Sequence, residues 1–351
     1  MKMKKKNPAS PLMEGKRRGI SSNAVTLLMV VVIYAVVCYL LYSGNMSRQV
    51  TNMLVSISCY IVLAVSLNLV VGLLGELSLG HAGFMSVGLF TGCLVSLATV
   101  DVLPLPVRLP VSMIVGGLAA AVVGLVVGLP ALRLKGDYLA IVTLGCGEII
   151  KTVITNLDVT GGAKGLNTTP IYGNAKTLLP YSIVLVFLVI IVMMNLKSSR
   201  HGRAIMAIRD NRIAAESNGV DITYYKLMVF ILAAFFAGMA GTIYGHSLSN
   251  NKAASFDYNM SIEILVLVVL GGMGSIRGSI IATIILRALP EALRVDWVSD
   301  YRMLAYSVLL IVIMLLNASP KFADLKGRWS IGNVIYFVAN QKKQKEAAHR
   351  D

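Results

Sequence analysis

The residues best suited to chemistry in this sequence are polar groups that interrupt long apolar stretches. Glu76, Ser78 and His81 lie together in the glycine-rich segment 72–83. A polar or charged group in apolar surroundings is costly unless it is hydrogen-bonded or paired, so each needs a partner or a role. Glu76 suits a polar route for a solute or a carboxylate held by backbone amides. His81 is more simply a packed, hydrogen-bonded histidine, and a nucleophile–base pair with Ser78 is least favoured because no third orienting group accompanies it.

Two further carboxylates stand in apolar stretches. Glu148 precedes Lys151 by three residues, a spacing that brings both side chains onto one face of a helix. A structural salt bridge that neutralises both is the favoured interpretation, and a place on a solute pathway is the alternative. Glu263 begins another apolar stretch, where it is also a pathway candidate. Arg277 lies in a second glycine-rich segment and is more simply an anchor at the membrane surface.

Motifs for nucleotide, metal or hydrolytic chemistry are absent from the 351 residues. No Gly-x-x-x-x-Gly-Lys-Ser/Thr phosphate loop occurs, and residues 161–165 hold a lysine among glycines without the required spacing. No His-Glu-x-x-His pair occurs, and the four cysteines have no metal-like spacing. The sequence therefore predicts no cofactor, no metal site and no enzymatic activity of its own.

The composition indicates an integral membrane protein. Hydrophobic residues make up 56% of the chain and charged residues 14%, with a mean hydropathy of +0.74. A soluble domain carries about 25% charged residues, because even a large core needs a charged surface. The net charge of +15 lies largely in two basic tails, 1–23 and 319–351, which favours contact with membrane lipid and no nucleic acid.

Ten apolar segments approach the roughly 20 residues that a helix needs to cross the hydrocarbon core. The predicted fold class is an all-α integral membrane protein with about ten transmembrane helices in one domain, 24–318. A count as low as eight stays open, because glycine-rich segments can be re-entrant. The third, sixth, eighth and ninth segments are short. The segments are 24–42, 53–74, 84–100, 111–131, 138–156, 181–196, 226–248, 260–274, 278–293 and 303–318.

Positive charge predicts the orientation of this topology. With ten spans, both tails lie on one side together with the loops 131–137, 197–225 and 275–277. Most of the 32 Lys and Arg residues fall on that side, and cytoplasmic loops are the ones enriched in these residues. Both termini are therefore expected in the cytoplasm.

Two glycine-rich interruptions, 72–83 and 271–278, break the apolar pattern in the two halves of the chain. Non-helical backbone within a bilayer persists only where protein or a water-filled cavity satisfies its polar groups. Broken helices in both halves commonly mark a transport pathway, whereas glycines also let helices pack closely. The pathway is the favoured interpretation.

The longest predicted cytoplasmic loop, 197–225, carries an amphipathic pattern, which predicts one short helix ending near Gly219. Its apolar positions are Ile205, Ile208, Ile213 and Val220. Such a helix can dock into a groove of a partner protein, or it can rest on lipid headgroups. The pattern alone favours neither.

Several segments resemble the branched-chain amino acid permease family of ATP-binding-cassette (ABC) importers. Residues 214–219, Ala-Ala-Glu-Ser-Asn-Gly, look like the cytoplasmic coupling loop of such permeases. The other matching segments are 75–83, 135–145, 160–165, 263–272 and 274–278. Their order and spacing are similar to the subunit that pairs with a second, related permease to transport leucine, isoleucine and valine. The resemblance covers roughly residues 50–295, and urea and short-amide importers use similar permeases.

The resemblance implies partners and a location. The partners are a second related permease subunit, two ABC ATPase subunits at the cytoplasmic loop, and an extracytoplasmic substrate-binding protein. The location is a plasma membrane of bacterial type, and ATP hydrolysis belongs to the partner chains. An ion-coupled secondary transporter is the less favoured alternative, because it would not need the coupling loop.

Three groups of candidate site residues follow from the polar positions and the resemblance together. The translocation-pathway candidates are Glu76, Ser78, His81, Glu148 and Glu263. The candidates for coupling to the ATPases are Arg209, Ala214, Ala215, Glu216 and Gly219. The candidates for docking the binding protein are Thr160, Gly161 and Gly162, for which a simple turn is the alternative.

Overall fold

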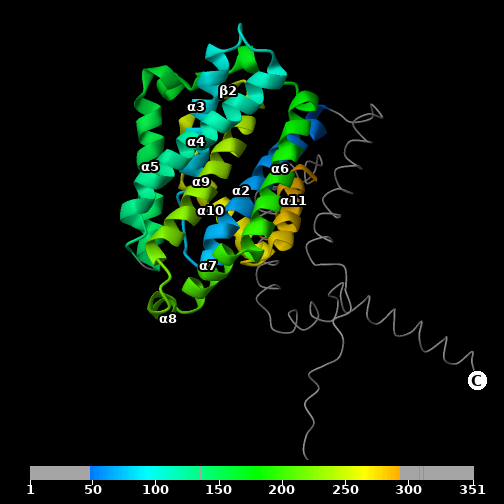
Figure 1. Cartoon of the computed structure of the whole chain (residues 1–351). Coiled ribbons are helices and arrows are strands. Elements are labelled where there is room, and N and C mark those ends of the chain that lie inside the picture. Colours follow the sequence, from blue (N-terminus) through cyan, green and yellow to red (C-terminus); the bar gives the residue numbers. More distant parts are fainter. Residues whose placement is uncertain (1–47, 135, 293–307, 309–310, 312–351) are drawn as a thin grey trace, which may run out of the picture. The chain divides into compact units, whose positions relative to one another are not determined.

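The computed structural model describes residues 48–134, 136–292, 308 and 311. All of them belong to the larger of two compact units into which the chain divides. The predicted span 24–42 and both basic tails lie outside the described residues, as does 303–318 apart from residues 308 and 311. Within the described ranges the chain is almost entirely helical, as its composition and apolar periodicity predict (Figure 1).

The long helices run in the order of the chain. They are α2 (Arg48–Asn68), α3 (His81–Ala98), α4 (Leu105–Ala131), α5 (Asp137–Asn156), α6 (Ala175–Ser198), α7 (Arg200–Asp210), α8 (Arg212–Ser217), α9 (Ile222–His246), α10 (Tyr258–Gly271) and α11 (Ile276–Ala292). A π-helical turn, η1 (Leu69–Leu74), extends α2. The shorter elements are η2 (Asp158–Thr160), η3 (Gly162–Lys164), β1 (Leu166–Asn167), η4 (Thr169–Ile171), β2 (Asn250–Asn251) and η5 (Ala253–Ser255).

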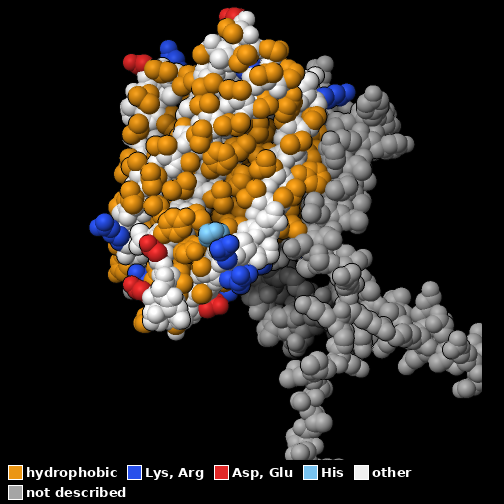
Figure 2. Space-filling view, viewed as in Figure 1, with side chains coloured by type: hydrophobic (Ala, Val, Ile, Leu, Met, Phe, Trp, Pro, Cys, Tyr) orange, Lys and Arg blue, Asp and Glu red, His pale blue; other side chains and the backbone are white. Residues whose placement is uncertain are grey.

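Seven helical stretches of the described residues are long and apolar enough to cross a membrane. They are Val50–Leu74, His81–Ala98, Leu105–Ala131, Asp137–Asn156, Lys176–Ser198, Ile222–His246 and Ala253–Gly271. The predicted ninth span corresponds to α11, which has 17 residues. Figure 2 shows hydrophobic side chains over the middle of one face, with most Lys, Arg, Asp and Glu side chains near its two ends. That distribution suits a bundle that stands across a bilayer.

Helices α3, α4 and α9 form a tightly packed group within the bundle. Glycines allow the closest approach: a Cβ added at Gly88 of α3 would overlap the backbone of Gly238 on α9. Thr242 of α9 donates a hydrogen bond to the Gly88 carbonyl at 2.9 Å, and the rings of Phe84 and Phe230 meet edge to face at 5.3 Å. Small residues that let helix backbones meet are typical of packing within membranes.

The two ends of the bundle differ (Figure 1). Helices α7 and α8 lie at one end, here named the α7 end, and the β1–β2 pair lies at the other, the β2 end. The two strands are antiparallel, with Leu166 opposite Asn251. Helix α5 lies at an edge, and only 22% of its most apolar window is buried, compared with 89% for the α2–η1 span.

Three helices begin earlier than their apolar patterns predict. Helix α3 begins at His81 rather than residue 84, because Gly80 and Gly83 pack against α5 at Thr143 and Gly147 instead of forming a loop. Helix α4 begins at Leu105 rather than residue 111, although its first turns contain two prolines and a charged residue. Helix α6 begins at Ala175 rather than residue 181 and has 24 residues, so the predicted sixth span was wrong in being short.

Charge explains part of these errors. Arg108 and Pro110 were interpreted as features of an outer loop that precedes a span. Arg108 is instead 7% exposed within α4, where its guanidinium donates to the carbonyl of Val100 at 3.3 Å. At the start of α6, Asn174 caps the helix by accepting from the amide of Lys176, and Pro180 is tolerated inside the helix.

Candidate functional site

The first glycine-rich interruption is a break between helices. Residues 75–80, here named break 1, are non-helical and follow directly on η1. Gly75 has φ 79°, a left-handed conformation that glycine adopts without strain and that ends the preceding helix. The break leans on α5, because the amide of Leu79 donates to the hydroxyl of Thr143 at 3.0 Å.

The second interruption is a sharp turn between α10 and α11. Residues 272–275, here named break 2, contain two glycines with positive φ, Gly272 at 92° and Gly274 at 80°. The amide of Ser275 donates to the carbonyl of Gly272 at 3.0 Å, which closes the turn. The sequence therefore correctly located non-helical backbone in both halves.

The structure brings break 2 against the turn that precedes break 1. Asn68, the last residue of α2, accepts a hydrogen bond from the amide of Gly274 at 2.7 Å and donates to the hydroxyl of Ser279 at 2.8 Å. A Cβ added at Gly72 of η1 would overlap the backbone of Gly274. Lys197, near the end of α6, donates to the Gly274 carbonyl at 2.9 Å. Neither Asn68 nor Lys197 stood out in the sequence.

Helix α7 contacts the same region from the α7 end of the bundle. The guanidinium of Arg209, a predicted coupling residue, donates to the carbonyl of Gly72 at 3.1 Å, and its aliphatic stem covers Gly75. Arg209 is also paired with its neighbour Asp210 at 2.9 Å. Ile205 and Ile208 face inward from α7 and are 0% and 5% exposed, which confirms the predicted apolar face over this helix.

The predicted single amphipathic helix is two helices. The chain is extended at Asn211, with φ −155° and ψ 103°, and the Asn211 side chain caps α8 by accepting from the amide of Ala214 at 3.1 Å. The new direction leaves Ile213 81% exposed, so its assignment to the same apolar face as Ile205 and Ile208 was wrong. The turn after α8 uses Gly219 with φ 79°.

The coupling candidates of α8 divide between its two faces. Ala215 is buried at 5% exposure and holds the helix against its neighbours, whereas Ala214 and Glu216 are exposed beside Ile213. Helix α8 therefore presents a small surface, Ile213, Ala214 and Glu216, that the described residues leave uncovered.

A buried ion pair joins break 1 to the base of α9. The ammonium group of Lys226 contacts Oε1 of Glu76, and the two side chains are 3% and 14% exposed. The second carboxylate oxygen of Glu76 and the hydroxyl of Ser78 are buried without a hydrogen-bond partner among the described residues. Arg209 and Lys226, from the two ends of the α7–α9 connection, thus hold the segment from Gly72 to Glu76 between them.

His81 is packed, as the sequence analysis favoured. It is 2% exposed at the start of α3, and its Nε2 lies 2.8 Å from the hydroxyl of Ser66 on α2. The structure gives no hydrogen bond between His81 and Ser78, so the geometry offers no nucleophile–base pair there. His81 instead ties the first residue of α3 to the neighbouring helix.

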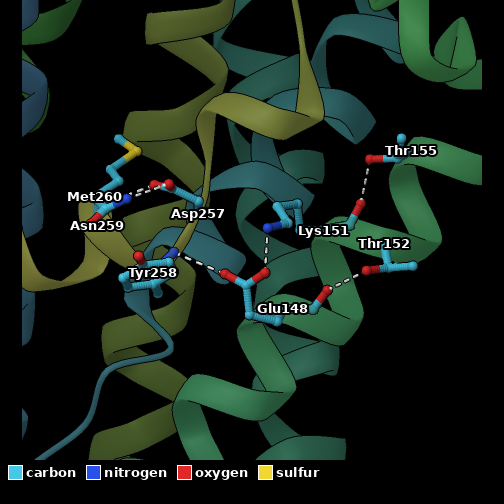
Figure 3. A network of polar contacts seen from close by, with 8 residues as sticks. All are labelled: Glu148, Lys151, Thr152, Thr155, Asp257, Tyr258, Asn259 and Met260. Atoms are coloured by element: carbon cyan, nitrogen blue, oxygen red, sulfur yellow. Dashed lines mark hydrogen bonds and ion pairs between the residues drawn. The ribbon is translucent and has the colours of Figure 1, made fainter.

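Glu148 and Lys151 form the predicted ion pair on α5. Figure 3 shows the Glu148 carboxylate between Lys151 and the backbone of Tyr258, whose amide donates to Oε1 at 2.9 Å. The pair therefore also fixes the beginning of α10. Its side chains remain about a quarter to a third exposed, at 32% for Glu148 and 23% for Lys151, on the span with the smallest buried share.

Glu263 of α10 is also paired. It lies 3.3 Å from Arg287 of α11, and that guanidinium stands 3.2 Å from the ring centroid of Tyr60 on α2. Arg287 was assigned to a loop by the sequence analysis and is instead part of a helix. The contact with Tyr60 is a cation–π interaction, so the three side chains join α2, α10 and α11.

The docking candidates lie in the loop at the β2 end. Thr160 is 4% exposed, and its hydroxyl donates to the carbonyl of Ile154 at 2.6 Å, so its side chain supports the loop from within. Gly161 and Gly162 have φ 78° and 58° and form the turn itself. The strand β2 pairs with the end of this loop and shapes its surface.

Two comparisons place this arrangement in a family. The sequence model described as "Branched-chain amino acid transport system / permease component" matches residues 49–318, which include both breaks and the whole α7–α8 segment. The chain belongs to this permease family. Its family match and its seven apolar spans make it a multi-pass membrane protein.

Similar proteins with names show the range of this permease family. The permease is 34% identical over 291 residues to the "High-affinity branched-chain amino acid transport system permease protein LivM" of Salmonella typhimurium, covering 73% of this chain and 66% of that protein. It is 34% identical over 304 residues to the Escherichia coli protein of the same name, covering 77% and 69%. The chain thus spans about two thirds of the length of these relatives.

A more distant relative has a different named substrate. The "Ribose import permease protein RbsC" of Haemophilus influenzae is 26% identical over 278 residues, covering 77% of the permease and 84% of that protein. No solved structure matches the chain. Among the described residues, no group of three or more His, Cys, Asp or Glu side chains is arranged to hold a metal ion.

Proposed function

We propose that this chain is the permease subunit of an ABC importer that carries leucine, isoleucine and valine across the plasma membrane. The observation that carries the proposal is the 34% identity to proteins named as branched-chain amino acid permeases. The geometry of the α7–α8 segment supports it, because an exposed helix is tied by Arg209 to the helix breaks. A separate ATPase needs such a lever to move the pore.

The α7 end is the cytoplasmic end in this proposal, with both termini on the same side. The exposed surface of α8, centred on Ile213 and Glu216, docks into a groove of an ATPase subunit. ATP-dependent closure displaces α7, and Arg209 transmits the displacement to the Gly72 carbonyl. A ligand or partner moves an equilibrium only through different contacts in the two states, and the bonds made by Arg209 and Lys226 supply such contacts.

The pathway runs beside α5, where a second permease subunit completes it. A partly exposed ion pair is costly against lipid, so the face of α5 that carries Glu148 and Lys151 faces water or protein. Glu76, Ser78, His81 and Glu263 act from within the bundle by holding break 1 and the α10–α11 pair in place. The permease therefore needs no dense substrate-binding cluster, because affinity resides mainly in the extracytoplasmic binding protein.

The binding protein docks at the β2 end. Gly161 and Gly162 form the exposed turn of that end, and Thr160 keeps the turn rigid from within. A rigid, preformed surface favours docking because less conformational entropy is lost on binding.

Substrate-stimulated ATP hydrolysis in proteoliposomes tests the proposal. The vesicles contain this chain, its partner permease, the two ATPases and the binding protein, and receive leucine, isoleucine or valine in separate samples. Stimulation by these amino acids supports the proposal, and stimulation by ribose or urea alone overturns its substrate. Transport by this chain alone on an ion gradient, without ATP, overturns the ABC mechanism.

Two variants address the coupling segment in the same vesicles. Glu216→Ala removes an exposed charge from the proposed docking surface. Gly219→Pro forces a negative φ where the structure has 79°, which redirects the end of α8. Both are expected to lower substrate-stimulated hydrolysis. Unchanged hydrolysis and transport in both variants would remove α8 from the coupling mechanism.

A further inference from the structure

The side chain of Asn68 joins two parts of the chain that lie 206 residues apart in sequence. It is 4% exposed and uses both ends of its carboxamide, with Oδ1 toward the Gly274 amide and Nδ2 toward Ser279. A backbone N–H can only donate, so the oxygen of the carboxamide must face Gly274. The hydroxyl of Ser279 donates to Ser275 at 3.3 Å and is thus free to accept from Nδ2. The orientation of Asn68 is therefore fixed by its partners.

The peptide that Asn68 holds is also held from its other side. Its amide meets Gly274, and the carbonyl of the same residue accepts from Lys197 of α6 at 2.9 Å. One turn beyond Asn68, Gly72 lies so close to Gly274 that a Cβ at residue 72 would overlap its backbone. Break 2 is consequently in direct backbone contact with the turn η1.

The same turn receives the contact from α7. Arg209 donates to the carbonyl of Gly72 at 3.1 Å, so residues 68–72 touch α7 at one side and break 2 at the other. Closely packed backbone transmits a displacement rather than absorbing it, because interiors have low compressibility. A movement of α7 against Gly72 is thus passed to break 2 only while Asn68 keeps the two in register.

We infer that Asn68 is a positioning residue that makes the two helix breaks move together when α7 moves, so that ATP hydrolysis is coupled to the opening of the pore. The inference rests on the proposed function. It adds a residue to the coupling mechanism that is distant in sequence from the coupling loop and contacts neither ATPase nor substrate. Its expected signature is lost coupling with retained hydrolysis.

The experiment measures substrate molecules transported per ATP hydrolysed in proteoliposomes of the complete importer. Asn68→Leu removes both hydrogen bonds at nearly constant volume, and Gly72→Ala forces the turn away from Gly274. In each, transport per ATP is expected to fall at least threefold, within the range of about 2- to 30-fold produced by changes along a coupled network. Asn156→Leu is the matched control, because Asn156 is exposed and donates only within its own helix, to Thr152.

A purely structural role predicts a different result. Assembled complex, hydrolysis and transport would then fall together, and their ratio would match that of the wild type and of the control. An unchanged ratio in Asn68→Leu and Gly72→Ala overturns the inference.

If Asn68→Leu fails to assemble, Ser279→Ala decides in its place, because it removes only the acceptor for Nδ2. A lowered ratio supports the inference, and an unchanged ratio overturns it. Wild-type complex without substrate-dependent hydrolysis would instead overturn the proposed function, so the two failures are distinguishable.

Discussion

Removing one partner of the ion pair between Lys226 and Glu76 is expected to destabilise the protein more than removing both. The two side chains are only 3% and 14% exposed, so either single substitution leaves a buried charge without its counter-charge. Breaking a buried pair in this way costs about 3 kcal/mol at the lower end of measured values. Glu76→Gln and Lys226→Met should each lower the free energy of unfolding by about that amount.

The double variant leaves no buried charge at this position. Replacing both partners of a buried pair by groups of similar size is often nearly neutral, so its cost is about 1 kcal/mol. At about 2 °C per kcal/mol for a chain of this size, each single variant should lose about 6 °C in Tm and the double variant about 2 °C. The expected order is therefore wild type, then the double variant, then either single variant.

Thermal unfolding of the purified permease in detergent, followed by size-exclusion chromatography after heating, measures this order. Asp158→Asn serves as the control, because it removes an exposed carboxylate from the loop at the β2 end. Additive losses, with the double variant less stable than both single variants, would refute the reasoning. That outcome would mean that solvent reaches the pair and that the two charges act independently.

Three other substitutions separate surface, loop and packing roles. Ile213→Asp places a charge at a side chain that is 81% exposed, so Tm should stay within 1 °C of wild type by, roughly, while co-purification with the ATPase subunits is lost; retained co-purification would contradict docking through α8. Thr160→Val removes the bond to Ile154 and should cost about 1 kcal/mol, or about 2 °C in the same unfolding assay, and no loss would mean that the loop does not depend on it. Gly88→Ala inserts a Cβ into the Gly238 backbone and should cost about 1 to 3 kcal/mol, whereas Gly145→Ala meets open space and should cost nothing measurable. Equal stability of these two glycine variants would contradict the packing of α3 on α9.

Hydropathy alone predicted the spans that its signal describes well. Helices α5 and α9 and the end of η1 agree with the predicted segments to within a few residues, because long apolar runs leave few alternatives. The errors lie where a polar or helix-breaking residue begins a helix. Arg108 within α4 and Pro180 within α6 suggested loops, but buried acceptors and a capping residue let both helices begin earlier.

The site was predictable in its parts but not in its connections. Glycine-rich sequence identified both breaks, and three-residue spacing identified the pair of Glu148 with Lys151, because these signals are local. The ion pair of Lys226 with Glu76 and the bonds made by Asn68 join residues 150 to 211 positions apart. No periodicity or motif encodes such pairs, since they depend on how whole helices pack. Ile213 was misassigned for a related reason: the cap at Asn211 changes the helix direction.

The two glycines nearest Arg209 explain why a coupling segment can act on this part of the bundle at all. Gly75 must be glycine for its φ of 79°, and any side chain there would also meet the stem of Arg209. Gly72 must be glycine because the Gly274 backbone occupies the space of its Cβ. Side chains at these positions would act as soft spacers with rotamers of their own. Without them, backbone, guanidinium and carboxamide are in direct contact, so a small displacement of α7 has few ways to be absorbed before it reaches break 2.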